Sequence, residues 1–281
     1  MSDVTDDFSA LASGERALAQ AVSRPRWAVY GFAVLAAVAG WVWLVIMDRA
    51  AVGGQGANGI LAYIAALCRP GSAGFGWQTA AIAFSMWFAM SVAMMLPSAA
   101  PLLRTYAEIA DTAARKGEQT VGLIVLIAGY LSVWTAFAVV AAALQLLFLS
   151  RGEIISLDDP VQGVLAAVIL LGAGAYQFSA LREACLEKCR NPFGILFARW
   201  TNRPVGVFKL GMEQGVFCLG CCWALMLVMF VVGAMNLAWM ALLTLFAVLE
   251  KSGGGKVTSR LSGCILILWG LALLALQTLS F

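Results

Sequence analysis

Long apolar stretches recur along this 281-residue chain, and they limit its fold more than any other feature of the sequence. A helix that crosses the ~30 Å hydrocarbon core of a bilayer needs about 20 apolar residues. Stretches of suitable composition cover residues 27–47, 77–96, 121–149, 161–178, 215–249 and, as a shorter candidate, 264–279. Only 12% of the residues are charged, roughly half the share of a typical soluble domain. The sequence therefore predicts an all-α, polytopic membrane helix bundle.

One of these stretches, 215–249, is too long for a single span. Its 35 residues would form a straight helix of about 52 Å, well beyond the hydrocarbon core. Gly233 and Asn236 lie near its middle, and both residue types tolerate the left-handed backbone angles of tight turns. We interpret the stretch as a helical hairpin, which gives about seven transmembrane helices in all.

Basic residues are distributed unevenly between the loops that seven spans would create. Arg49, Arg69 and Arg151 fall on one side, and the other Lys and Arg residues fall on the side of the N-terminus. Because Lys and Arg accumulate in cytoplasmic loops, we expect a cytoplasmic N-terminus and a C-terminus on the outside.

The polar segments define the domain organisation. Residues 1–26 are polar and lack the apolar stretch and small-residue cleavage site of a signal peptide, so we expect a cytoplasmic N-terminal tail. Residues 27–281 then form a single transmembrane helical domain with an inner loop at 179–212. We find no linker that would divide this domain in two.

Five cysteines form two close groups, each beside an apolar stretch. Cys185 and Cys189 are four residues apart, and the second group consists of Cys218, Cys221 and Cys222. Residues three or four positions apart share one face of a helix. In the predicted topology both groups lie at the cytoplasmic face, where thiols stay reduced. Thiolates are soft ligands that select Cu(I), with Zn(II) as the second choice, so the two groups together predict a metal site.

Methionines extend the sulfur-bearing faces into the predicted membrane, in a chain that contains 11 of them. Met226 and Met229 continue the face of the second cysteine group. Met94 ends a series at four-residue intervals that includes Met86 and Met90. Thioethers also bind Cu(I), which makes these side chains candidate ligands. The alternative is simple packing, because methionine fills irregular gaps between helices.

Other polar and sulfur-containing residues have plainer interpretations. Glu250 and Lys251 close the sixth span, most simply as an interfacial pair that reaches toward the headgroups, with metal binding by Glu250 as the alternative. Glu213 and Gln214 open the fifth span. The plain interpretation is that the helix N-terminus favours an acidic residue, and the alternative is that the two residues bind or support the metal. We interpret Cys68 and Cys264 as small buried hydrophobic residues.

The composition also excludes several classes of function. The chain has no histidine, which excludes His-ligated haem, zinc catalysis on a His frame and Ser-His-Asp chemistry. It has no phosphate-binding glycine loop and no basic patch interleaved with aromatic residues. We therefore expect neither a nucleotide nor a nucleic acid as a partner, and a binding protein rather than an enzyme.

Three segments, 87–97, 176–192 and 215–251, resemble motifs of the domain of unknown function 2182 family. The third contains the sequence Cys-Leu-Gly-Cys-Cys-Trp, which is the most specific part of a resemblance that covers roughly residues 77–270. The resemblance implies a bacterial inner-membrane protein that binds a metal ion. Family members often have His where this chain has Gln214, and that difference favours Cu(I) further.

These observations predict a multi-pass protein of the bacterial inner (plasma) membrane that binds Cu(I) for transport or delivery. The predicted ligands are Cys218, Cys221, Cys222, Cys185, Cys189, Met94, Met226 and Met229. Its partners would be the lipid bilayer, the metal ion and a metallochaperone or membrane enzyme. Two alternatives remain open. One is a membrane thiol oxidoreductase whose cysteines cycle through a disulfide, and the other is a non-catalytic structural subunit of a membrane complex.

Overall fold

The computed structural model describes residues 25–52, 76–118, 120–152, 160–234, 236–253 and 256–279. These residues are almost entirely α-helical and include no strand, which confirms the predicted all-α class. The helices are α2 (Pro25–Val52), α4 (Trp77–Ser98), α5 (Ala100–Arg115), α6 (Leu123–Arg151), α7 (Gly163–Tyr176), α8 (Ala180–Arg190), α9 (Phe193–Ala198), α10 (Pro204–Val232), α11 (Leu237–Ser252) and α12 (Lys256–Leu279). Cys68 and all but the last two residues of the predicted N-terminal tail lie outside the described residues.

Four of the described helices, α4, α6, α10 and α12, are long and apolar enough to cross a membrane. The bent pair α7 and α8, which turns by 64° at its junction, would make a fifth span. The described chain thus holds four or five candidate spans, fewer than the seven that we predicted. The main reason is length, because α7 has 14 residues and α11 has 16, short of the ~20 that a span needs. Helix α2 covers the first predicted span, but several of its side chains lie outside the description and it is not among the four.

The hairpin predicted within residues 215–249 is present. Gly233 follows the last residue of α10 with a φ of 90°, a backbone angle that favours glycine. The Asn236 side chain then caps α11 by accepting a hydrogen bond from the backbone N–H of Trp239 at 3.2 Å. Local turn chemistry therefore separates α10 from α11.

The segment predicted as an inner loop at 179–212 is itself mostly helical. Ser179 caps α8 by accepting a hydrogen bond from the backbone N–H of Leu181 at 3.2 Å. Helix α9 follows, and α10 begins at Pro204, a residue type favoured in the first helical turn. Because α10 begins earlier than predicted, its cysteines lie in the middle of a 29-residue helix rather than in the first two turns.

Glycines allow α6 and α10 to approach each other closely. A side chain on Gly129 would clash with the backbone oxygen of Phe208. On the facing helix, a side chain on Gly211 would clash with the backbone oxygen of Leu126. Small residues at such contacts let apolar helices gain packing energy from direct backbone contact. This pairing fixes α10 against α6 at the centre of the bundle.

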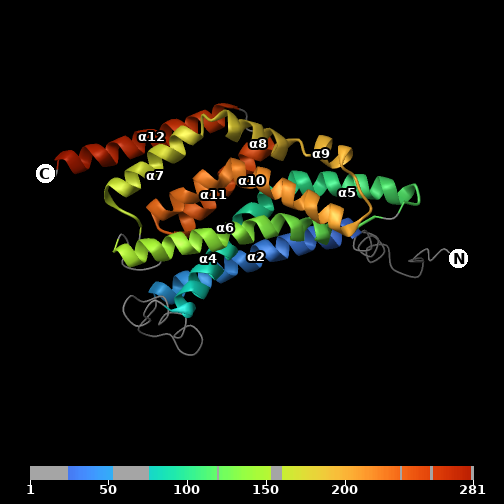
Figure 1. The fold of residues 1–281 in the computed structure, drawn as a ribbon, viewed down its shortest axis with the longest axis horizontal. Helices are drawn as coiled ribbons and strands as arrows, with labels where there is room; N and C mark the ends of the chain where they lie inside the picture. Colours follow the sequence, from blue (N-terminus) through green and yellow to red (C-terminus); the bar gives the residue numbers. More distant parts are fainter. Residues whose placement is uncertain are drawn as a thin grey trace, which may run out of the picture.

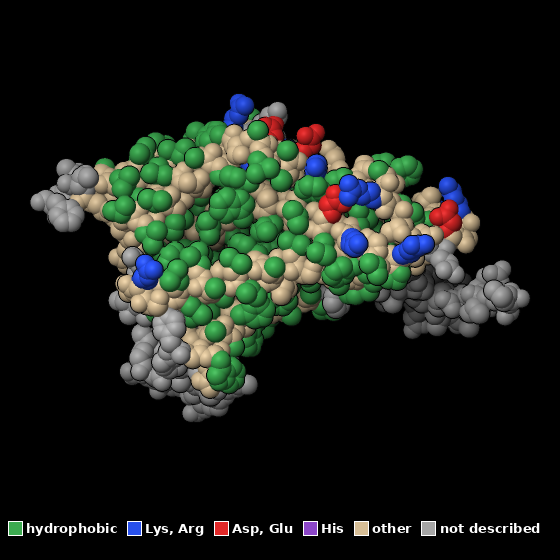
Figure 2. Space-filling model, in the orientation of Figure 1, with side chains coloured by type: hydrophobic (Ala, Val, Ile, Leu, Met, Phe, Trp, Pro, Cys, Tyr) green, Lys and Arg blue, Asp and Glu red, His purple; other side chains and the backbone are tan. Residues whose placement is uncertain are grey.

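The remaining helices arrange around this central pair (Figure 1). Helices α7 and α12 lie side by side along one flank, and α2 packs against α4 on the other. Helix α8 contacts both α10 and α11, and α11 contacts α4. Figure 2 shows charged side chains gathered toward the end of the molecule where α5, α8 and α9 lie, with hydrophobic side chains over most of the rest of this face. This distribution is consistent with a membrane protein that has a polar end.

Candidate metal centre

Three cysteines of α10 form a compact cluster of thiols. The sulfur atoms of Cys218, Cys221 and Cys222 all lie within 4.8 Å of one another, and those of Cys221 and Cys222 are 3.3 Å apart. The spacing explains the cluster, because residues three and four positions after Cys218 return to its face of the helix. All three side chains are buried, so the cluster lies inside the bundle.

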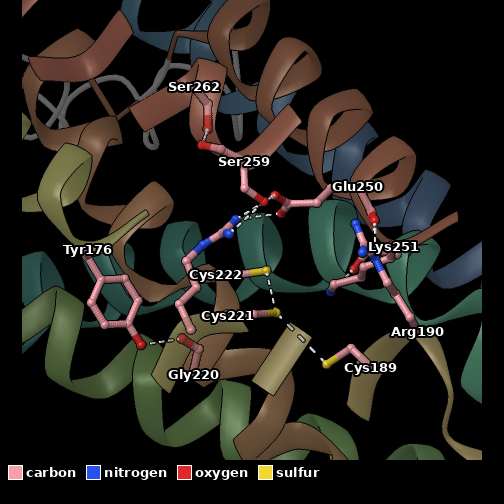
Figure 3. Close-up of polar contacts among 12 residues, drawn as sticks. Tyr176, Cys189, Arg190, Gly220, Cys221, Cys222, Glu250, Lys251, Ser259 and Ser262 are labelled. Atoms are coloured by element: carbon pink, nitrogen blue, oxygen red, sulfur yellow. Dashed lines mark hydrogen bonds and ion pairs between the residues drawn. The ribbon is translucent and has the colours of Figure 1, made fainter. Parts of the chain in front are cut away.

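Helix α8 brings a fourth sulfur to this cluster. The sulfur of Cys189 lies 3.9 Å from that of Cys221, and Figure 3 shows the sulfur atoms of Cys189, Cys221 and Cys222 in a row. The structure therefore brings together residues of the two groups that the sequence singled out. It does so through the packing of α8 on α10, which lie next to each other.

Cys185 lies one turn away on α8 and is half-buried. Its sulfur fills the space where Gly220 has no side chain, because a Cβ on that glycine would be only 2.7 Å from it. The backbone oxygen of the same glycine accepts a hydrogen bond from the Tyr176 hydroxyl at 2.6 Å. Gly220 is thus the point at which the bend between α7 and α8 is held against α10.

Cys218 has polar neighbours that the sequence did not reveal. The ammonium group of Lys251 donates hydrogen bonds to the sulfur of Cys218 at 3.0 Å and to the hydroxyl of Ser98 at 2.8 Å. The Tyr130 hydroxyl lies 2.9 Å from the same sulfur and donates to the backbone oxygen of Met95 at 3.1 Å. The positive charge of Lys251 stabilises a thiolate at Cys218, the form in which cysteine binds metals.

The prediction that Glu250 and Lys251 form an interfacial pair is wrong. Lys251 is buried at the thiol cluster, and the fully buried carboxylate of Glu250 accepts bonds of 2.6 and 2.7 Å from Arg182. Arg182 also donates to the Ser259 hydroxyl at 2.9 Å, and this hydroxyl hydrogen bonds to Glu250. Arg190 donates to the backbone oxygen of Glu250 at 2.7 Å. The reason for the difference is tertiary, since α8 and α12 supply polar partners inside the bundle (Figure 3).

The predicted methionine ligands Met94, Met226 and Met229 are all buried in the core that also contains the cysteines of α10. The sulfur of Met95, the residue after Met94, lies 3.9 Å from the Ser98 hydroxyl, which in turn accepts a hydrogen bond from Lys251. Burial of this kind is what packing alone requires. A ligand role for Met94, Met226 and Met229 stays a prediction.

A small recess opens at the cluster beside Cys189, Cys218 and Lys251. Its volume is about 10 Å³, close to the space that one water molecule needs. Gln214 also lines it, and the amide nitrogen of this buried side chain has no hydrogen-bond partner among the described residues. The unpartnered amide N–H group is a hydrogen-bond donor and cannot bind a cation, so in this recess the sulfur atoms are the groups suited to a soft metal ion. Cys264, expected to be buried, is exposed on α12.

A bundle of apolar helices that encloses a cluster of thiols is typical of a membrane protein with a candidate metal site. The chain belongs to the PpoB2 copper chaperone family, whose family model matches residues 84–273. The matched region includes both cysteine groups together with Arg182, Glu250 and Lys251. This family name differs from that of the family whose motifs the sequence resembles, and it supports a copper-related protein. No curated protein and no solved structure matches the chain.

Proposed function

We propose that the protein binds copper as Cu(I) at the thiol cluster and passes the ion on, across the membrane or to a protein partner. The observation that carries this proposal is the meeting of four sulfurs from two helices, those of Cys218, Cys221, Cys222 and Cys189. Such soft donors select Cu(I) among biological metals. Membership in a copper chaperone family supports the same metal.

The surroundings of the cluster favour Cu(I) over Zn(II). A structural zinc ion takes four ligands in a tetrahedron. Among the four sulfurs, that of Cys218 already accepts a hydrogen bond from Lys251 and contacts the Tyr130 hydroxyl. These contacts restrict how Cys218 can move to become the fourth ligand of a zinc ion. Cu(I) accepts lower coordination numbers than Zn(II), so a subset of the sulfurs is sufficient for it.

The ion would move by exchange of sulfur ligands. Cys185 is half-buried and one turn from Cys189, so it is placed to contact an incoming ion before the buried cysteines do. Met94, Met226 and Met229 are the candidate ligands further along. In each exchange one copper–sulfur bond forms as another breaks, and the copper stays Cu(I). Where a thiol enters and a thiolate leaves, the proton passes from the first to the second.

We further propose that the protein lies in the bacterial inner membrane with its N-terminus in the cytoplasm. The apolar helices and the polar end of the molecule support a membrane location. The proposed orientation comes from the distribution of basic residues between the loops of seven spans, so it requires α2, the α7–α8 pair and α11 to cross the bilayer as well. A metallochaperone or a membrane enzyme would then exchange the ion with the cluster.

Copper content of the purified full chain tests the proposal. We compare the wild type with a Cys218→Ser/Cys222→Ser variant, and use Cys264→Ser as the matched control because that cysteine is exposed on α12. Wild type and control should retain copper, whereas the double variant should lose it. Equal copper per chain in all three proteins, each with unchanged helical content by circular dichroism, would remove the proposal.

A further inference from the structure

The buried ammonium group of Lys251 is the starting point of the inference. Its side chain is only 4% exposed, and it lies against the thiol cluster on one side and Ser98 on the other. The adjacent carboxylate of Glu250 faces Arg182 instead. Among the described residues, a thiolate at Cys218 is therefore the negative charge that Lys251 contacts.

The position of this positive charge is fixed by the fold. Ser98 at the end of α4 holds the ammonium group at 2.8 Å. Glu250, the residue before Lys251, is anchored by its ion pair with Arg182. The two side chains of this pair are each 1% exposed. Lys251 thus cannot leave the cluster without breaking buried polar contacts, which is costly.

A fixed positive charge beside a metal site discriminates between ions of different charge. For any given number of ionised thiols, the site carries one more positive charge with Zn(II) than with Cu(I), and the fixed ammonium group repels the divalent ion more strongly. Burying an uncompensated charge is unfavourable. One extra unit of charge at about 5 Å changes a binding constant by on the order of a few hundredfold at the effective dielectric constant of protein sites.

We propose that Lys251 is a specificity-determining residue that makes the cluster prefer a monovalent soft cation over a divalent one. The inference rests on the proposed function, because it takes the cluster as the binding site. It goes further by assigning the choice of ion to a residue that is not a ligand. The Cys residues supply affinity for soft metals, and Lys251 supplies the discrimination by charge.

The test compares dissociation constants for Cu(I) and Zn(II) in the full-length protein, measured under reducing conditions by competition with chromophoric chelators. Lys251→Leu removes the charge, keeps most of the volume and adds no metal-binding atom, while Lys251→Arg keeps the charge. The ratio of the two constants, rather than either alone, is the readout because loss of thiolate character at Cys218 affects both metals. We expect the preference for Cu(I) to fall at least about tenfold in Lys251→Leu and to persist in Lys251→Arg.

A second pair of variants leaves Lys251 in place. Ser98→Asp adds a negative charge beside the ammonium group, and Ser98→Asn is its neutral control of similar size. The preference for Cu(I) should fall in Ser98→Asp relative to Ser98→Asn. This pair decides the question if Lys251→Leu does not fold.

The outcomes separate the two proposals. If the wild type prefers Cu(I) and neither charge change alters the preference by more than about twofold, the role of Lys251 is overturned while copper binding stands. If the wild type binds neither ion at the cluster, both proposals are overturned.

Discussion

The sulfur of Cys189 lies 3.9 Å from the sulfur of Cys221, although the two residues are 32 positions apart and belong to different helices. Cys221 is fixed by its own helix, where its thiol also donates to the backbone oxygen of Cys218 at 3.1 Å. Cys189 depends on how α8 packs. The four-sulfur cluster is therefore a tertiary feature, and changes that move α8 should alter metal binding without touching a cysteine.

Gly220→Val should separate α8 from α10. A side chain at this position would run into the sulfur of Cys185, at 2.7 Å from the first added carbon, and α8 would have to move. We expect reduced copper retention with helical content preserved. Gly172→Val is the control, since a Cβ there has nothing within 4 Å. Copper per chain measures the effect, and equal retention in both variants would contradict a role for close α8 packing.

Arg182→Met should destabilise the fold strongly, because it leaves the Glu250 carboxylate buried without its partner. Removing one partner of a buried ion pair costs about 3–5 kcal/mol. The Arg182→Met/Glu250→Leu double variant should recover much of that loss, since no unpaired charge remains. Unfolding by heat or denaturant provides the measurement.

The exposed pair Arg199–Glu213 is the control for that prediction. Its arginine side chain is 67% exposed, and pairs of this kind contribute about 1 kcal/mol or less. Arg199→Met should therefore unfold close to the wild type. An equally small effect for Arg182→Met would show that the Arg182–Glu250 contact does not hold α8 to α11.

Adding Cu(I) should raise the unfolding temperature of the wild-type protein. A ligand that binds only the folded state stabilises it by about 2.7 kcal/mol when its free concentration is about 100 times Kd. The shift should be absent in Cys218→Ser/Cys222→Ser and present in Cys264→Ser. Differential scanning fluorimetry in detergent measures it. An identical shift in the cluster variant would place the bound copper elsewhere.

The thiols of the cluster should be reduced in cells. The cysteines of the described residues are free in the structure, including Cys221 and Cys222 at 3.3 Å. We expect rapid alkylation of denatured protein, followed by mass spectrometry, to find Cys189, Cys221 and Cys222 each carrying one label. A Cys189–Cys221 or Cys221–Cys222 disulfide in a substantial share of chains would instead favour a thiol oxidoreductase.

The parts of this structure that follow from local chemistry were predictable from the sequence. The spacing of Cys218, Cys221 and Cys222 places them on one helical face without reference to the rest of the chain. The turn at Gly233 and Asn236 similarly depends on residues within a few positions of each other. Apolar composition was sufficient for the helical class.

The contacts that a single helix cannot determine were not predictable. Lys251 meets Cys218 across 33 positions and Ser98 across 153, and no periodic pattern marks such pairs. The hydropathy pattern predicted a membrane boundary at the end of α11. Lysine at such a boundary usually points to solvent, so we expected the same of Lys251. The same limit applies to the number of spans, because composition does not show that the segment before Ser179 bends after only 14 helical residues.

The 64° bend between α7 and α8 has a mechanical consequence. It turns α8 out of line with α7. Helix α8 is therefore a short side arm that brings Cys185 and Cys189 to α10. The short turn at residues 177–179 joins it to α7, and the Arg182 and Arg190 bonds to Glu250 hold both of its ends. Because these contacts lie inside the bundle, moving α8 away from α10 means breaking a buried ion pair, whereas the long helices α6 and α10 do not depend on it.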